Sequence, residues 1–186
     1  MKSEAILDQS VPDLRQGIDQ LREELAGFRY SLFRLETLQN YSGSSGDEAF
    51  AEWRRTGRVP VTAELEQWCV RTRQAVAVGC RVQRVHVVTE PLSDYVRFEL
   101  ASYAPNVQSS EEVRIIPVRG GRWPADVSAG DFWLIDARRL WTMRYAADGA
   151  WLGAEPTTDP QCLAAACAQR DAALAQSISW SEYNSR

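Results

Sequence analysis

Two kinds of hydrophobic periodicity run along the chain, and the first predicts a helix near the N-terminus. Apolar residues recur there at alternating spacings of four and three positions, which is typical of a helix with one apolar face. They are Leu14, Ile18, Leu21, Leu25, Phe28 and Leu32. Two uses of this face stay open. It covers the sheet of its own domain, or it forms a homodimer or partner interface through Leu14, Ile18, Leu21, Leu25 and Phe28.

Three further segments carry helix signals. Residues 47–56 begin with acidic side chains, end with arginines and are followed by Gly57, an order that suits the helix dipole and a glycine stop. A second helix is expected over residues 62–77, with Leu65 and Trp68 on its apolar face. The sequence Thr158-Asp-Pro160 predicts the start of a last helix, which ends near Gln176.

From Arg81 onward the pattern changes to the alternation of apolar and polar residues that is typical of strands. The candidate strands are residues 81–88, 95–102, 113–118, 131–135, 140–145 and 151–154. Short connectors join the last three, and one of them carries an Asp148-Gly149 turn signal, so antiparallel pairing is favoured.

These elements predict an α+β fold: a largely antiparallel sheet of five or six strands, with helices on one face and an amphipathic helix at the N-terminus. A length of 186 residues with 45% hydrophobic content suits one domain with its own core. We expect a helical extension over residues 1–32, a single α+β domain over 33–178 and a loose tail over 179–186.

Charge and composition exclude several classes of function. The formal net charge is −4, and the arginines are scattered singly rather than gathered in a basic patch, so direct binding of nucleic acid is not expected. No apolar segment approaches the length of a membrane span, and the N-terminus lacks the pattern of a secretion signal. We therefore expect a cytoplasmic protein without a membrane segment.

The metal-ligating and thiol residues are few and dispersed. The four cysteines, at positions 69, 80, 162 and 167, show no C-x-x-C spacing, and His86 is the only histidine. Zinc and iron sites with two histidines are thereby excluded, and a disulfide framework is not indicated. We expect reduced cysteines, no metal and no cofactor.

The densest set of functional groups lies between Arg81 and Tyr103. If both predicted strands of this region pair, the alternation places Arg84 and His86 of one strand and polar residues of the other on one sheet face. The members of the second strand are Tyr95, Arg97, Glu99 and Tyr103. Glu90 and Asp94, in the connector, are expected at the rim.

Two interpretations of this polar face stay open. Arg84 and Arg97, beside Tyr95, could hold the carboxylate or phosphate of an anionic small molecule in bidentate hydrogen bonds. Alternatively, Glu99 already neutralises an arginine, and the face is a structural ion-pair network. The aromatic residues of the later strands, Trp133, Trp141, Tyr145 and Trp151, form either ordinary core or the walls of a pocket.

Several long motifs resemble those of an uncharacterised family of small actinobacterial proteins. The motifs are Phe33-Arg-Leu-Glu-Thr-Leu38, the segment from Arg84 to Leu100, Asp131-Phe-Trp-Leu-Ile-Asp136 and the segment from Met143 to Glu155. The resemblance spans about residues 33–175. It implies a domain of unknown function, often encoded near helix-turn-helix regulators, and hence a regulatory or ligand-sensing role.

The sequence therefore supports two hypotheses of function. In the first, the protein is a non-catalytic regulatory module that binds an anionic small molecule or a segment of a partner protein on the Arg/His/Tyr/Glu face. In the second, it is a small cofactor-independent enzyme of a biosynthetic pathway, in which His86 or Glu99 acts as acid or base on an anionic substrate.

Overall fold

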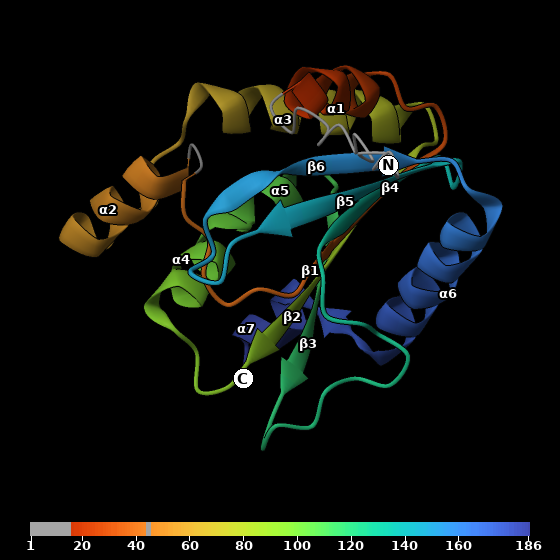
Figure 1. The fold of residues 1–186 in the computed structure, drawn as a ribbon. Helices are drawn as coiled ribbons and strands as arrows, with labels where there is room; N and C mark the ends of the chain where they lie inside the picture. The colour runs from red at the N-terminus through yellow and green to blue at the C-terminus, as the bar shows by residue number, and fades with distance from the viewer. Residues whose placement is uncertain (1–15, 44–45) are drawn as a thin grey trace, which may run out of the picture.

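A computed structural model describes residues 16–43 and 46–186, and its centre is one mixed β-sheet (Figure 1). Within these residues the sheet has seven strands in the order β6-β5-β4-β1-β2-β3-β7. The strands are β1 (Ser31–Glu36), β2 (Arg81–Thr89), β3 (Glu112–Val118), β4 (Phe132–Ile135), β5 (Arg139–Tyr145), β6 (Trp151–Thr157) and β7 (Ile178–Ser179). The helices are α1 (Gln16–Ala26), α2 (Gly46–Thr56), α3 (Ala63–Ala77), α4 (Asp94–Ser102), α5 (Ala104–Gln108), α6 (Pro160–Gln176) and α7 (Trp180–Asn184).

The α+β class is confirmed, and the sheet is mixed rather than purely antiparallel: among the described residues, four strand pairings are antiparallel and two are parallel. Strands β1, β2 and β3 run parallel, whereas β4, β5, β6 and β7 pair antiparallel with their neighbours. The chain returns from β1 to β2 through α2 and α3, and from β2 to β3 through α4 and α5. Parallel neighbours need such crossovers, and the sequence interpretation had replaced the second crossover by a strand.

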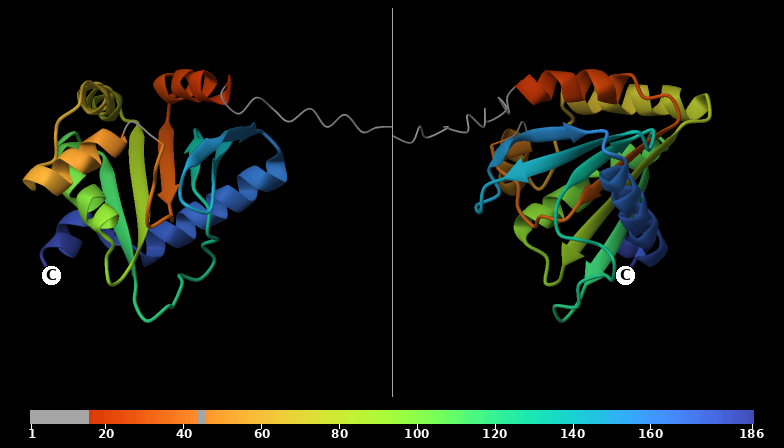
Figure 2. Two further views of the ribbon diagram at one scale, coloured as in Figure 1. Left: turned by 60° about the vertical axis from the view of Figure 1, so that its left-hand side comes forward. Right: turned by 45° about the vertical axis from the view of Figure 1, so that its right-hand side comes forward.

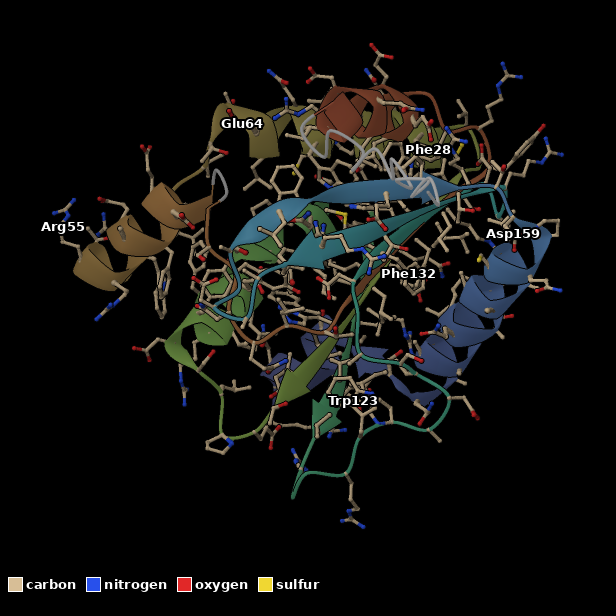
Figure 3. All side chains as sticks on the ribbon, viewed as in Figure 1. Phe28, Arg55, Glu64, Trp123, Phe132 and Asp159 are labelled. Carbon is tan, nitrogen blue, oxygen red and sulfur yellow. The ribbon has the colours of Figure 1, made fainter. Side chains whose placement is uncertain are left out.

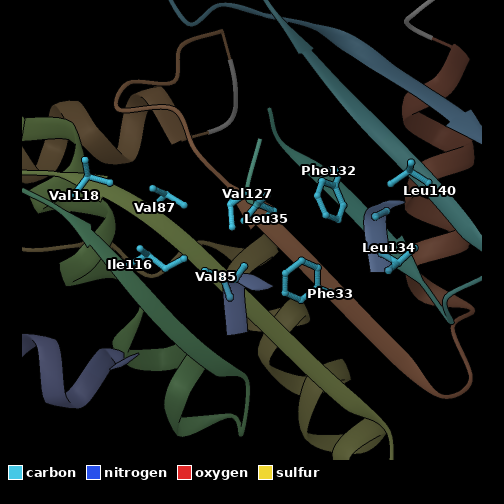
Figure 4. Packing of buried hydrophobic residues seen from close by; sticks show 12 residues of the cluster. Phe33, Leu35, Val85, Val87, Ile116, Val118, Val127, Phe132, Leu134 and Leu140 are labelled. Carbon is cyan, nitrogen blue, oxygen red and sulfur yellow. The ribbon is translucent and has the colours of Figure 1, made fainter. Parts of the chain in front are cut away.

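Helices cover both faces of the sheet, and the prediction of helices on one face only was wrong. One face carries α1, α3, α4 and α5, and α6 lies on the opposite side (Figure 2). Ala166 and Ala173 of α6 pack against the valines, leucines and phenylalanines shown in Figure 4. The small side chains of Ala166 and Ala173 let α6 approach the sheet closely, and Leu163 and Leu174 of the same helix pack against the cluster beside them.

The central strand, β1, was not predicted. It alternates Leu32, Arg34 and Glu36 toward the α1/α3 face with Phe33 and Leu35 toward α6. The four-three spacing had continued the N-terminal helix through Leu32, whereas α1 ends at Ala26.

Helix α1 packs on the sheet of its own chain. Leu21 is buried, and Leu25 and Phe28 contact the same cluster as Trp133 and Trp141. The close approach depends on Gly17, where a Cβ atom would lie 2.8 Å from the backbone oxygen of Ala154. Leu14 lies outside the described residues, and the homodimer through this face stays a prediction.

Helix α4 replaces the strand predicted over residues 95–102. Ser93 caps it by accepting a hydrogen bond from the Val96 amide at 3.1 Å, and Asp94 stands in its first turn, where it suits the helix dipole. Tyr95, Val96, Phe98 and Leu100 are buried, a set that fits two helix sides rather than one face of a strand. Over so short a segment, the order of apolar and polar residues fits both the two-residue period of a strand and the 3.6-residue period of a helix.

The C-terminal residues are part of the fold rather than a loose tail. Strand β7 pairs with β3, and α7 places Trp180 and Tyr183 against a cluster that contains Leu100 and Tyr103. The Trp180 indole N–H donates to the Leu100 carbonyl at 2.8 Å. The other predicted helices and strands are confirmed within a few residues, as α2, α3, α6, β2, β3, β4, β5 and β6.

Candidate functional site

A buried carboxylate at the end of the central strand organises the site. Glu36, the last residue of β1, has a side chain that is only 1% exposed. Its Oε1 lies 2.7 Å from Arg34 Nη2, and its Oε2 accepts hydrogen bonds from Arg84 Nη1 at 2.8 Å and from the Tyr103 hydroxyl at 3.1 Å. Glu36 thus holds two guanidinium groups and a phenol in place.

Arg84 bridges two carboxylates. Besides contacting Glu36, it donates from Nε to Glu111 Oε1 at 2.8 Å. Glu111 in turn accepts hydrogen bonds from the Trp68 indole at 2.6 Å and from the Asn106 amide at 2.7 Å. The order of this network is Arg34, Glu36, Arg84, Glu111, so two positive and two negative charges alternate beneath α3 and α5.

His86 extends the network away from solvent. It is fully buried on β2, and its Nδ1 lies 2.9 Å from the Tyr103 hydroxyl. The other ring nitrogen, Nε2, lies 3.4 Å from the carbonyl oxygen of Leu38. Since that oxygen can only accept and the hydroxyl proton of Tyr103 donates to Glu36, a neutral His86 ring donates either from Nδ1 to Tyr103 or from Nε2 to Leu38. Burial lowers the pKa of His86, so the imidazole is neutral at pH 7.

The pKa values of Glu36 and Glu99 are shifted in opposite directions. Burial alone would raise the pKa of Glu36, but the charges of Arg34 and Arg84 lower it to about 2. Burial, reinforced by the negative charge of Glu36, raises the pKa of Glu99 well above its usual range. Glu36 is therefore a carboxylate at pH 7, whereas Glu99 holds its proton more strongly than an ordinary glutamate does.

A further buried carboxyl group, that of Asp131, lies beside this cluster. Asp131, just before β4, accepts hydrogen bonds from the Tyr41 hydroxyl at 2.6 Å and from the backbone amide and hydroxyl of Thr37 at 2.8 and 2.9 Å. Burial raises the pKa of Asp131, while the hydrogen bond from Tyr41 opposes that rise. These bonds fix the turn by which the chain leaves β1.

A cleft of about 520 Å³ opens above the cluster. Its volume lies within the range of small-molecule sites. Arg34, Glu36, Arg84 and Glu99 line its base, and α3, whose first turn carries Glu64 (labelled in Figure 3), borders it. The aromatic members of the lining are Tyr41, Trp68, Tyr95, Phe98, Tyr103, Trp133, Tyr145 and Trp151.

Three side chains of the cleft contain a buried polar atom without a hydrogen-bond partner among the described residues. These atoms are Arg34 Nε, Glu99 Oε2 and Trp151 Nε1. Glu99 Oε2 is 3.7 Å from His86 Nδ1, which is too long for a hydrogen bond. A buried polar group without a partner costs free energy, and a ligand can supply the missing bonds.

The structure brings together five of the eight predicted site residues. Arg84, Tyr95, Glu99 and Tyr103 line the cleft, and His86 lies behind Tyr103.

The other three predicted residues lie elsewhere. Arg97 and Asp94 are exposed on α4, because a helix turns them away from the residues that a strand would have placed beside them. Glu90 pairs with Arg119, with an Nε to Oε2 distance of 2.7 Å, and accepts a hydrogen bond from the Tyr183 hydroxyl at 3.0 Å. The proposed anchor of Arg84 with Arg97 was therefore wrong, and Arg84 belongs to an ion-pair network.

Sequence reasoning missed Arg34, Glu36, Glu111 and Asp131. Arg34 and Glu36 carried a usable signal, because polar residues alternate there with Phe33 and Leu35 as in a strand. Glu111 and Asp131 stand just before β3 and β4, and nothing in their immediate sequence marks them as buried.

Two further observations concern metals and membranes. In the part of the chain that the structure describes, no group of three or more His, Cys, Asp or Glu side chains is arranged to hold a metal ion. Over the same residues, no helix combines the length and apolar character needed to cross a membrane.

Fold and site together define an α+β protein with a small-molecule-sized cleft above a buried ion-pair network. The chain belongs to the family described as Domain of unknown function (DUF6879), whose model matches residues 19–185. The expected membership of an uncharacterised family is thereby confirmed. A search of curated proteins found no match to this chain.

Proposed function

We propose that the protein is a non-catalytic binding module that holds a small organic molecule in the cleft. The observation that carries the proposal is the set of unpartnered atoms on Arg34, Glu99 and Trp151, all of which belong to side chains of one cleft in the described structure. Aromatic walls beside a few polar groups are typical of small-molecule sites. A flat ligand would lie against the walls and direct its polar group to the base.

A regulatory role agrees with this design. Hydrogen bonds and ion pairs hold the cluster under the cleft in place. In contrast, α2, which carries Ala49 at the cleft, has no buried residue. The resemblance to proteins encoded near helix-turn-helix regulators favours a sensor whose bound state is read by a partner protein. The ligand is the input to such a sensor.

The alternative is a small enzyme that uses the same cleft. It is favoured by Glu99, whose raised pKa keeps a proton available at a side chain that lines the cleft. His86 is fully buried and does not line the cleft, so in such an enzyme it would position or recharge Glu99 rather than meet the substrate.

The proposal is tested by blocking the cleft. We expect Ala49→Trp, which places a large side chain in the lining, to weaken binding by about tenfold or more. Ala51→Trp, at an exposed position of the same helix, is the matched control and retains binding. The probes are benzyl alcohol, benzamide, benzoate, benzylamine and their naphthalene analogues. Their binding is measured by thermal shift and by tryptophan fluorescence.

Two results would oppose the proposal. Failure of every probe to bind wild-type protein at millimolar concentration argues against a small-molecule cleft. Equal binding by both tryptophan variants places the ligand elsewhere. Turnover of a bound probe that is abolished in Glu99→Gln would instead favour the enzyme.

A further inference from the structure

We propose that the ligand of the cleft is an organic carboxylate, held by the guanidinium group of Arg34 and the carboxyl group of Glu99. This inference rests on the proposed function and adds the chemical class of the ligand. It follows from a comparison of the two arginines of the cluster, from the position of Glu99 and from the kinds of polar atom that lack partners.

Arg34 is available to a ligand, and Arg84 is not. Arg84 is saturated by carboxylates on two sides, and its side chain is 10% exposed. Among the described residues Arg34 pairs with one carboxylate, that of Glu36, its Nε lacks a hydrogen-bond partner, and its side chain is 22% exposed. It lies over the Trp133 ring, with 4.9 Å from Cζ to the ring centroid, which holds the guanidinium plane at the cleft. A carboxylate can accept from the free edge of such a guanidinium group.

Glu99 is placed to act as a hydrogen-bond donor. Its side chain is 14% exposed, and its Oε2 finds no partner in the described part of the chain. Burial and the charge of Glu36 raise the pKa of Glu99, which favours the protonated form, and the O–H of that form can donate to a carboxylate. The titratable groups around it are Arg34 and Glu36 on β1, Tyr41 and Asp131 from the adjoining loops, Arg84 and His86 on β2, Tyr95 on α4, Tyr103 after α4 and Tyr145 on β5.

The kinds of buried polar atom that lack a hydrogen-bond partner favour an anionic ligand over a cationic one. Arg34 Nε and Trp151 Nε1 can only donate, and protonated Glu99 adds a third donor at the same cleft of the described structure. A carboxylate offers acceptors and no donor. An ammonium group would add donors beside the positive charge of Arg34, and it would gain only by ionising Glu99.

The first experiment compares probes of one shape and three charges. Binding of benzoate, benzamide and benzylamine, and of the corresponding naphthalene compounds, is measured by calorimetry on the full chain. We expect each carboxylate to bind about tenfold or more tightly than the matching amide and amine. Carboxylate binding should weaken as the pH rises, by up to about tenfold per unit once Glu99 ionises in the free protein.

Substitutions then separate the two groups. Arg34→Lys keeps the charge but loses the planar fork, and we expect about a tenfold loss of carboxylate affinity. Arg97→Lys, on the exposed side of α4, is the matched control and leaves affinity unchanged. Glu99→Gln keeps an uncharged donor, so carboxylate affinity at neutral pH should stay within about threefold of wild type and lose its alkaline decline.

Each contrary result has one meaning. Tightest binding by an amine, abolished in Glu99→Gln, overturns the carboxylate proposal and keeps the binding module. If an amide or alcohol binds most tightly and Arg34→Lys does not change its affinity, the carboxylate proposal is likewise overturned and the binding module is kept. Carboxylate binding that Arg34→Lys leaves intact removes Arg34 from the site. Absence of binding by every probe instead opposes the proposed function itself.

Discussion

At the scale of single residues, the main feature is a set of charges that neutralise one another inside the protein. Glu36 is paired on two sides by arginines, and Arg84 is paired on two sides by glutamates. Taking such charges out of water is costly, and only their mutual attraction and hydrogen bonds offset the cost. Removing one member leaves its partners buried and unpaired.

We therefore expect Glu36→Gln to lower the free energy of unfolding by about 3 to 5 kcal/mol, as is typical of breaking a buried pair. Glu155→Gln, which breaks the exposed pair with Arg144, is the matched control and should cost less than about 1 kcal/mol. Denaturant unfolding at neutral pH measures both. Equal small losses would show that the buried pair is not needed for stability.

The same pair gives an acid dependence with a definite sign. The pKa of Glu36 is about 2 in the folded state, against an ordinary value of 4.5, so its stabilising contribution is present above pH 4.5. That contribution, about 3 kcal/mol from the shift, is lost as the pH falls from 4.5 toward 2. Wild-type protein should lose more stability over this interval than Glu36→Gln, whose unfolding is followed in parallel.

At the scale of elements, local patterns predicted those segments whose periodicity is long or whose ends are marked. Helices α2, α3 and α6 have clear start signals, and α3 and α6 are capped by Thr62 and Asp159 as such signals require. Strand β1 failed because Leu32 extended the helical spacing of α1 by chance, and α4 failed because its apolar residues fit both periods over a short length. The candidate site depended on both elements. Sequence reasoning consequently found the residues on β2 and α4 but paired them with the wrong neighbours.

The contact of α1 with β6 allows a direct test of which matters more at Gly17, close backbone packing or intrinsic helix propensity. Gly17→Ala raises helix propensity but brings a Cβ atom within 2.8 Å of the Ala154 backbone oxygen. We expect it to destabilise the protein by about 1 to 3 kcal/mol, since backbone must shift. Gly27→Ala, whose nearest contact would be an oxygen at 3.4 Å, is the control and should be close to neutral. Thermal unfolding compares them, and a stabilised Gly17→Ala would contradict the packing argument.

At the scale of the whole molecule, the cleft draws on both halves of the sheet. Parallel strands β1 and β2 supply the charged base, and antiparallel strands β4, β5 and β6 supply Trp133, Tyr145 and Trp151. The C-terminal segment supports this arrangement from the side, because Trp180 shares a buried cluster with Tyr103.

We therefore expect a chain that ends at Ser177 to lose several kcal/mol of stability, since deletion of β7 and α7 uncovers apolar side chains of β2, β3 and α4. Trp180→Phe keeps most of the apolar contact and loses the hydrogen bond to Leu100, so it should cost only about 1 kcal/mol. Denaturant unfolding of both variants measures the difference. A truncated chain as stable as wild type would show that residues after 177 contribute nothing to the fold.

The alternation of charge through Arg34, Glu36, Arg84 and Glu111 has a consequence for how this family can diverge. A change at one of these positions leaves a partner charge unpaired in the interior, so an isolated substitution lowers stability. A simultaneous exchange of all four residues for apolar ones need not do so. Relatives should therefore fall into two groups, those that retain all four residues and those that have replaced them together. Exposed positions such as Arg97 carry no such constraint and are free to vary one at a time.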